Sequence, residues 1–351
     1  MKKLMVLLLL TVGFILVGCE TEPNVERYNR NFIGVFDSII SVSVWYAEDD
    51  INIDEIFNDI DEMLWNIHKI STKYDLYDGV VNIKTINENP GIAHPVDEHL
   101  ITMLEMSIEA YNDPLMNGSF NVALGSVLNI WSQYRNNCLD NEVCEIPSTT
   151  ELHAAAEFIN PNDIVIDNDA NTVLIPEGMQ LDLGGAAKGY GAELVGVYLR
   201  NTNAVAFMVN AGSSNIEFFG DNPNPNRDYW TIGLKNPDNP NATYATIAVE
   251  AGWNIVTSGD YERFYVVDGV EYHHIINPET LFPSWHIRAV TVVSKNPALG
   301  DIYSTAAFVL PLEDAITFIN SLEDVEAIWF DEDDVIHYSE NFEAQFLYNR
   351  D

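Results

Sequence analysis

The sequence predicts an α+β fold, and three features of its pattern lead to that class. Residues 38–46 alternate apolar and polar side chains, which is the period of a half-buried strand. Residues 53–67 and 100–111 carry apolar side chains at the i, i+3, i+4, i+7 spacing of amphipathic helices. Strand and helix patterns then follow one another without a regular β-α-β rhythm, so the class is α+β rather than alternating α/β.

Patterns further along the chain extend this mixture. Two hairpins are predicted, residues 164–167 with 172–175 and residues 264–267 with 270–273, the second around a favoured Asp-Gly turn. The acidic residues 331–334 are expected to form the solvated turn of a last hairpin. The other predicted elements are buried strands at 204–209 and 289–294, a helix that opens within residues 181–190 and runs to about residue 199, and helices at 302–310 and 312–320.

The first residues have the pattern of a targeting segment. Two lysines precede an apolar run over residues 4–17, which is too short for a comfortable membrane span. The Leu-Val-Gly-Cys tetrapeptide at residues 16–19 resembles a bacterial lipobox. An uncleaved anchor helix is the alternative interpretation.

The lipobox predicts three consecutive segments at this end of the chain. Residues 1–18 are expected to be a cleaved lipoprotein signal peptide, Cys19 the lipidated residue, and residues 19–31 a polar tether. The protein is therefore expected at the cytoplasmic (inner) membrane, anchored by lipid and facing the extracytoplasmic or periplasmic side.

The charge of the chain excludes several classes of function. The 351 residues include 16 Lys and Arg against 54 Asp and Glu, a formal net charge of −38. Phosphate contacts need Lys and Arg, so no nucleic-acid partner is expected. Attachment to anionic lipid through a basic face is excluded for the same reason. A phosphate-bearing ligand must instead be met by a metal ion or by a local arrangement of backbone amides.

Two of the three cysteines lie in a polar, acidic stretch at about residues 136–148. The extracytoplasmic compartment is oxidising, which favours a small disulfide loop between Cys138 and Cys144. Free thiols in a solvated loop are the alternative. A metal pair is disfavoured because no histidine lies nearby.

A glycine-rich segment over residues 181–190 opens a predicted helix. Gly184 and Gly185 let backbone approach a ligand closely, and free N–H groups at a helix start favour an anion. Lys188 adds a charge that suits a phosphate. The spacing matches neither a P-loop nor a dinucleotide fingerprint, so a structural turn and a phosphate site both stay open.

Two further polar segments lie near predicted strands. Residues 209–215 form a Gly/Ser loop for which a strand-end turn is the plainer interpretation. Residues 257–263 precede the hairpin that leads to His273 and His274. Neighbouring strand residues point to opposite faces, which predicts one buried and one exposed histidine. A hydrogen-bonded structural histidine is favoured over a ligand on this pattern alone.

A last segment brings a carboxylate and a hydroxyl together. If residues 298–305 are helical, Asp301 and Thr305 are i and i+4 and share a face. With nearby backbone carbonyls they form an all-oxygen set suited to Mg²⁺. Helix caps are the alternative role for both residues.

Taken in order, these segments resemble the ApbE family, the FAD:protein FMN transferases. The matching stretches are residues 36–38, 71–74, 118–125, 182–190, 210–213, 257–263, 273–278 and 298–305. The resemblance spans about residues 32–347. It implies one large domain over residues 32–351, with mixed or antiparallel sheets and flanking helices.

The resemblance also implies a reaction. A family member binds FAD and Mg²⁺, with Mn²⁺ as a possible substitute, and cleaves the FAD pyrophosphate. FMN is linked by a phosphoester to a Thr or Ser in a motif of an extracytoplasmic acceptor flavoprotein, and AMP is released. Two alternatives stay open: a Mg²⁺-dependent FAD pyrophosphatase that yields FMN and AMP, and a non-catalytic FAD-binding lipoprotein.

The resemblance further implies which residues form the site. The metal ligands would be the backbone oxygens of Gly185 and Ala298 with the side chains of Asp301 and Thr305. His274 would serve as the base for the acceptor hydroxyl, and Asp301 would also be catalytic. The FAD contacts would be Phe36, Tyr74, Ser119, Phe120, Asn121, Asp182, Lys188 and Ile275.

The chain departs from the family pattern at several positions. The usual Asp residues are Asn121 and Asn277 here, and Leu281 stands where the pattern has glycine. Asp182, Lys188 and the metal-ligating side chains are kept, so activity is expected.

Overall fold

An antiparallel sheet of eight strands organises the fold. The computed structural model describes residues 25–47, 51–141, 143–212, 214–224, 226–239 and 241–348, so the predicted signal peptide and Cys19 lie outside the described residues. The strands follow one another across the sheet as β1 (Glu26–Ile33), β2 (Ile39–Tyr46), β6 (Ala206–Ala211), β7 (Asn215–Phe219), β10 (Asn254–Gly259), β13 (Ile287–Ser294), β14 (Val325–Asp331) and β15 (Ile336–Tyr338).

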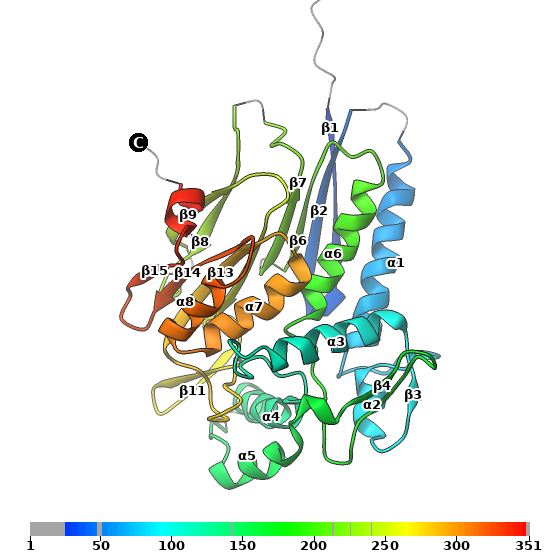
Figure 1. The fold of residues 1–351 in the computed structure, drawn as a ribbon, viewed down its shortest axis with the longest axis vertical. Coiled ribbons are helices and arrows are strands. Elements are labelled where there is room, and N and C mark those ends of the chain that lie inside the picture. Colours follow the sequence, from blue (N-terminus) through cyan, green and yellow to red (C-terminus); the bar gives the residue numbers. More distant parts are fainter. Residues whose placement is uncertain are drawn as a thin grey trace, which may run out of the picture.

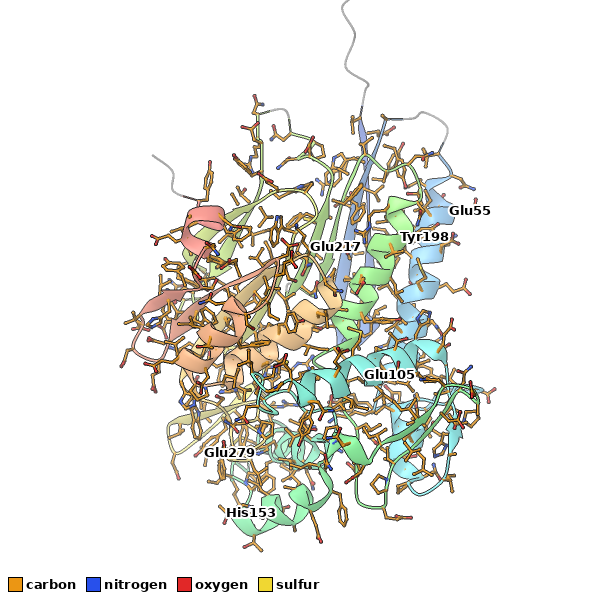
Figure 2. The ribbon with its side chains drawn as sticks, viewed as in Figure 1. Glu55, Glu105, His153, Tyr198, Glu217 and Glu279 are labelled. Carbon is orange, nitrogen blue, oxygen red and sulfur yellow. A yellow bond between two sulfur atoms is a disulfide. The ribbon has the colours of Figure 1, made fainter. Side chains whose placement is uncertain are left out.

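Helices cover one face of this sheet (Figure 1). Apolar residues of α1 (Ile53–Ser71) and α6 (Ala187–Arg200) pack on β2 and β6 in one core cluster. A larger cluster joins α3 (Glu98–Asn112), α7 (Pro297–Val309) and α8 (Leu312–Asn320) to β13 and β14. Two side-chain hydrogen bonds hold the last turn of α6: Tyr198 donates to Asp59 of α1 at 2.6 Å, and Arg200 donates to Glu217 of β7 at 2.6 Å. Figure 2 labels Tyr198 and Glu217.

The opposite face of the sheet carries a second, smaller sheet. It consists of β8 (Trp230–Lys235) and β9 (Thr243–Val249), and α9 (Phe342–Phe346) packs beside it. A separate core cluster of aromatic and branched residues, including Phe218, Trp230 and Phe342, lies between these layers. The large sheet is therefore buried on both faces.

The remaining elements form the lower part of the molecule in Figure 1. A small sheet pairs β3 (His94–Pro95), β5 (Thr172–Leu174) and β4 (Val165–Asp167), with α2 (Ile83–Glu88) nearby. A further core cluster joins α4 (Gly125–Asn141) and α5 (Thr149–Ala155) to the hairpin of β11 (Phe264–Val267) and β12 (Val270–His273). Short 3-10 turns at Val35–Asp37, Ala156–Phe158 and Pro161–Asp163 complete the connections.

The structure confirms the predicted α+β class and corrects two boundaries. The tether predicted over residues 19–31 is wrong for residues 26–31, because they belong to β1 and pair with β2. This edge strand is largely polar, so its sequence lacks the apolar alternation of a half-buried strand. The helix predicted from residue 302 begins at Pro297, capped by the Asn296 side chain on the Leu299 N–H at 2.9 Å.

The polar stretch at residues 136–148 starts as the end of a helix. Residues 136–141 are the last turns of α4, which the sequence analysis did not predict. Cys138 on this helix is joined to Cys144 by a disulfide. The bond therefore fastens the end of α4 to the chain that leaves it. Within the described residues, no helix is both long and apolar enough to cross a bilayer.

Candidate functional site

The site is built where helices α6 and α7 cross closely. Gly189 permits the approach, because a Cβ there would lie 2.5 Å from the Pro297 carbonyl oxygen and 2.8 Å from Cβ of Asp301. The Gly189 N–H, close to the start of α6, donates to Oδ2 of Asp301 at 2.9 Å. The glycine thus holds the Asp301 carboxylate against the first turn of another helix.

Asp301 is a buried carboxylate without an ion-pair partner among the described residues. Burial raises its pKa, and the charge of Lys188 and the Gly189 N–H partly oppose that rise. Thr305, one turn further along α7, donates its hydroxyl to the Asp301 backbone oxygen at 3.2 Å. A carboxylate held in this way is short of compensating positive charge.

The glycine-rich residues 181–186, which precede α6, lie against Thr305 of α7. A Cβ on Gly185 would lie 3.3 Å from Oγ1 of Thr305 and 3.0 Å from the Phe120 ring. A Cβ on Gly189 would lie 3.1 Å from Cα of Ala298. Three of the four predicted metal-ligating residues, Ala298, Asp301 and Thr305, therefore share α7, and the fourth, Gly185, lies against Thr305.

The predicted donor set is of the kind that suits a hard divalent cation. No group of three His, Cys, Asp or Glu side chains that could hold a metal occurs in the described residues. The predicted set instead offers one carboxylate, one hydroxyl and backbone oxygens, which are the ligands that Mg²⁺ accepts when phosphate oxygens complete its shell. Asp301 is the charged member, and its unpaired burial is the feature that a cation would relieve.

Asp182 forms a buried charge pair beside the glycine-rich residues 181–190. Its carboxylate lies 2.6 Å from Nζ of Lys73, and these side chains are 16 % and 6 % exposed. Burial raises the pKa of Asp182, but the Lys73 charge more than offsets this and the pKa falls below its usual value. Lys73 also donates to Asn129 at 2.6 Å. Lys73, which the sequence analysis did not select, is thus the partner of a predicted FAD contact.

A short backbone ladder places the residues around 120 beside the glycine loop. The Asp182 N–H donates to the Val122 carbonyl at 2.8 Å. Oγ of Ser119 is buried and has no hydrogen-bond partner among the described residues, so it is free to meet a ligand. Asn121 differs, because its amide donates to the Ile159 carbonyl and accepts from the Ala123 N–H. Its side chain is therefore occupied within its own loop.

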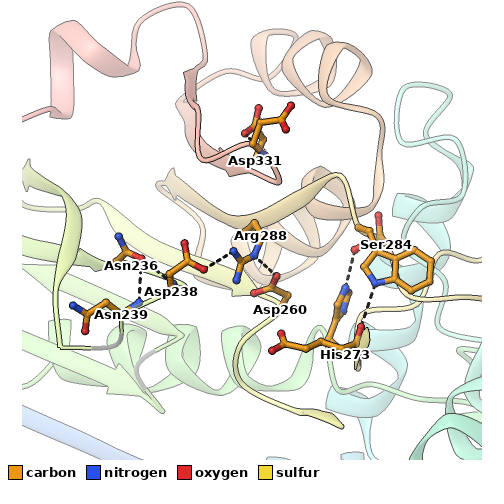
Figure 3. Close-up of polar contacts among 11 residues, drawn as sticks. Asn236, Asp238, Asn239, Asp260, His273, Ser284, Arg288 and Asp331 are labelled. Carbon is orange, nitrogen blue, oxygen red and sulfur yellow. Dashed lines mark hydrogen bonds and ion pairs between the residues drawn. The ribbon is translucent and has the colours of Figure 1, made fainter. Parts of the chain in front are cut away.

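The histidine pair departs from the predicted alternation. His273 is buried, as expected for one member, but His274 is half-buried rather than exposed. The reason is that β12 ends at His273, so His274 has left the strand and turns inward. Nδ1 of His273 accepts from the Ile275 N–H at 3.2 Å, so its Nε2 donates to the Ser284 carbonyl at 2.7 Å (Figure 3). His273 is the structural member of the pair.

His274 is the member without a structural role. Its Nδ1 is buried and has no hydrogen-bond partner among the described residues. Burial lowers its pKa to about 3, and neighbouring groups that carry or gain positive charge add to the effect: His273, Arg263, Arg135 and Lys188. The imidazole is therefore neutral at physiological pH.

Three cations around His274 lack a carboxylate partner among the described residues. Lys188 donates to Oγ of Ser214 at 2.5 Å, from the Gly/Ser loop after β6. Arg135 comes from α4 and Arg263 from the loop before β11, and both act on the pKa of His274. In a chain with net charge −38, such a gathering of uncompensated cations provides a place for an anion.

The segment at 257–263 contributes structure as well as this arginine. Asp260 accepts from Nε of Arg288 at 2.7 Å, and Arg288 also pairs with Asp238 at 2.7 Å (Figure 3). Asp260 thus fastens the end of β10 to β13 and to the loop before β9. We assign this aspartate to the scaffold.

The last three predicted FAD contacts have different settings. Phe36 has a left-handed backbone (φ 50°), and its ring would lie 3.1 Å from a Cβ on Gly191 of α6. Tyr74 is 51 % exposed, with Lys73 over its ring at 5.4 Å. Ile275 is buried beside the histidine pair. Tyr74 thus lies beside Lys73 and Ile275 follows His274, whereas Phe36 packs against α6 at Gly191.

Sequence reasoning missed three of the charged residues. Lys73 and Arg263 lie inside segments that matched the family pattern, so an inventory of their cations could have found them. Arg135 carries no such signal, because it belongs to the unpredicted helix α4. Only the packing of α4 against the β11–β12 hairpin brings it to the site.

Comparisons with known proteins agree with this arrangement. Residues 36–329 match the sequence model of the ApbE family. The FAD:protein FMN transferase of Klebsiella pneumoniae is 31 % identical over 214 residues, which are 60 % of this chain and 63 % of that protein. The FAD:protein FMN transferase of Treponema pallidum is 29 % identical over 247 residues, 67 % of this chain and 66 % of that protein. The aligned part therefore spans slightly less than two thirds of these relatives.

Solved structures show the same fold. The crystal structure of the ApbE protein of Thermotoga maritima superposes with a TM-score of 0.77 at 27 % identity, covering 91 % of this chain and 99 % of that one. The flavin transferase ApbE of Vibrio cholerae gives a TM-score of 0.77 at 22 % identity, covering 92 % and 100 %.

Proposed function

Because the chain belongs to the ApbE family, we propose that it is a Mg²⁺-dependent FAD:protein FMN transferase. It cleaves the FAD pyrophosphate, joins FMN through a phosphoester to a Thr or Ser of an acceptor flavoprotein, and releases AMP. The observation that carries this proposal is the gathering of Arg135, Arg263 and Lys188 around His274, together with the buried and unpaired Asp301, whose pKa the charge of Lys188 also lowers.

The charges of the site suit a pyrophosphate. The three cations and the N–H groups at the start of α6 would attract its two negative phosphates. Asp301 and Thr305 would hold Mg²⁺ together with backbone oxygens of Gly185 and Ala298. A bound Mg²⁺ would neutralise charge on the pyrophosphate as that charge moves toward the leaving group.

In the transfer step, His274 would accept the proton of the acceptor hydroxyl. The hydroxyl oxygen of the acceptor forms a bond to the phosphorus of the FMN half, and the bond from that phosphorus to the bridging oxygen breaks. AMP leaves with the bridging oxygen, and the hydroxyl proton passes to the neutral imidazole. A pyrophosphate beside His274 would raise its pKa from about 3, since an anion favours the charged imidazolium. Bound FAD would thus make His274 a stronger base for the hydroxyl proton.

We also propose the anchored location. The lipobox-like residues 16–19 support lipidation of Cys19 and an extracytoplasmic acceptor. The acceptor is then a protein whose Thr or Ser lies on that side of the membrane.

The proposal is tested by mass. The chain lacking residues 1–19 is incubated with FAD, Mg²⁺ and peptides that carry candidate Thr or Ser motifs, with and without chelator. A chelator-sensitive gain of one FMN on a peptide, with AMP in solution, is the expected result. Free FMN and AMP with no peptide product would indicate the pyrophosphatase instead, and intact FAD with all peptides would indicate a flavin-binding lipoprotein.

Two variants separate the roles of metal and base. Asp301→Ala should abolish Mg²⁺-dependent turnover, and unchanged turnover would refute the metal assignment. His274→Ala should slow transfer while FAD binding persists, and an unchanged rate would remove His274 from the mechanism.

A further inference from the structure

A second cationic site lies on the opposite face of the large sheet. A cavity of about 230 Å³ is lined there by residues of four adjacent strands, of β8 and of the loop before it. Arg27, Trp45, Met208 and Phe218 form its floor from β1, β2, β6 and β7, with Trp230 and Arg227 at its side. None of the residues that line it belongs to the candidate functional site.

The register of the sheet explains how this floor is assembled. Arg27 is paired with Trp45, and Met208 with Phe218, so these side chains share one face of adjoining strands. The Trp45 and Trp230 rings meet edge to face at 5.7 Å, and the Arg27 guanidinium lies over the Trp45 ring at 5.2 Å. Phe218 and Trp230 stack on each other at 5.0 Å, so the cavity combines the half-buried Trp45 ring with a cation.

Its two arginines are free of carboxylates. Within the described part of the chain, neither Arg27 nor Arg227 forms an ion pair, although acidic residues greatly outnumber basic ones. Arg27 donates to Oγ of Ser43 at 2.9 Å, and Arg227 to Oγ1 of Thr231 at 3.3 Å. A guanidinium has five N–H donors, so most donors of both residues stay available to a ligand.

The unpaired cations of the described chain follow a pattern. Apart from Lys69, which lies over the Tyr77 ring, the lysines and arginines that form no ion pair with a carboxylate lie at two places. One is the group around His274 and the other is this cavity. Both arginines of the cavity are exposed, so their free N–H donors can be reached by an anion from solution.

We propose that this cavity binds a small, flat organic anion, with an aromatic or conjugated body and a carboxylate or phosphate group. The body would lie against the half-buried Trp45, Met208 and Ile232, and the acid group would accept hydrogen bonds from Arg27 and Arg227. The volume is below the usual 300–1,000 Å³ of pockets for drug-sized ligands, which limits the ligand to about one ring system. A whole dinucleotide such as FAD is too large for it.

The experiment uses phenyl phosphate as the probe and benzamide as its uncharged counterpart. Binding to the chain lacking residues 1–19 is measured by saturation-transfer NMR and by titration calorimetry. We expect a Kd of about 1 mM for phenyl phosphate, the weak end of affinities for a ligand of this size. Benzamide should bind at least tenfold more weakly. No detectable binding of phenyl phosphate would overturn the proposal.

Variants of both faces locate the binding. Arg27→Met and Arg227→Met keep the apolar stems of these exposed side chains, and each should weaken binding, with the double variant at least tenfold weaker. Arg30→Met is the matched control, because Arg30 lies on the other face of β1 and pairs with Asp54 at 2.8 Å. It should bind as the parent does.

A last variant excludes the other cationic group as the source of the signal. Arg263→Met should leave phenyl phosphate binding in the cavity unchanged. Binding that is lost in Arg263→Met but kept in the Arg27→Met, Arg227→Met double variant would place the probe near His274 and overturn the proposal. Loss in all variants, including Arg30→Met, would show non-specific attraction to any surface cation and would overturn it too.

Discussion

Replacing Gly189 by alanine tests how closely α6 and α7 approach each other. The new Cβ would lie 2.5 Å from the Pro297 oxygen and 3.1 Å from Cα of Ala298, both of them backbone atoms that cannot rotate away. The helices must therefore separate by nearly 1 Å here, because ordinary contact starts at 3.4 Å. The Gly189 N–H would then move away from the Asp301 carboxylate that it now contacts at 2.9 Å.

The expected cost combines two opposing effects. Overpacking of a tight contact costs about 1–3 kcal/mol, and fixed backbone on the opposite side puts this site at the upper end. The better helix propensity of alanine returns about 1 kcal/mol. We therefore expect a net loss of about 2 kcal/mol in the free energy of unfolding, together with a loss of transfer activity because Asp301 is displaced.

Urea unfolding of the chain lacking residues 1–19 measures the first effect, and FMN transfer the second. The matched control is Gly191→Ala on the same helix, whose Cβ would meet the Phe36 ring at 3.1 Å, a side chain that can move. It should change stability by less than about 1 kcal/mol, as clash and propensity offset each other. A Gly189→Ala protein with unchanged stability and full activity would refute the close crossing of the two helices.

Three further outcomes are expected. Asp182→Asn leaves the buried Lys73 ammonium without its anion and should lower the free energy of unfolding, measured with urea, by about 3 kcal/mol. The double variant Lys73→Met, Asp182→Leu should recover part of that loss. Equal stability of the single variant and the parent would contradict the buried pair. Burial lowers the pKa of His273 to about 4, below the unfolded value of 6.5, so the folded protein binds fewer protons and its stability should fall by up to about 3 kcal/mol as the pH drops from 6.5 through 4. The free energy of unfolding should change less over this pH range in His273→Gln than in the parent. The same pH dependence in both proteins would refute the assignment. Cys138→Ser with Cys144→Ser opens a short covalent loop and should cost about 2 kcal/mol or less, read from urea unfolding of the parent with and without reductant beside the variant.

The predictable part of this fold is the part whose sequence pattern is local. The stripe of α1, the β11–β12 hairpin with its Asp-Gly turn, and the final hairpin all follow from spacing within a few residues. β1 escaped prediction because a polar edge strand needs no apolar alternation, and its partner β2 supplies the order. The start of α7 was misplaced although Asn296 and Pro297 form a recognisable cap and first turn.

In the candidate site, too, the predictable features are those whose residues lie close together in the chain. The glycine loop and the Asp301–Thr305 pair were visible because their residues are close in the chain. The pairing of Lys73 with Asp182 joins residues far apart in sequence, and only tertiary packing brings Arg135 to His274. The inward turn of His274 likewise depends on where β12 ends, which a rule of alternation within a strand does not decide.

The order of strands in the large sheet has a consequence for how the chain folds. β2 pairs on its inner side with β6, and the partners Ile40 and Ala211 are separated by about 170 residues. The hairpin of β1 and β2 can form early and locally, but its inner edge stays open until that long loop closes. Such non-local closure slows folding, and an open strand edge can pair with another molecule in the meantime. Refolding should therefore show a slow phase. The yield of refolded protein should fall as protein concentration rises, because molecules aggregate before β6 has paired with β2.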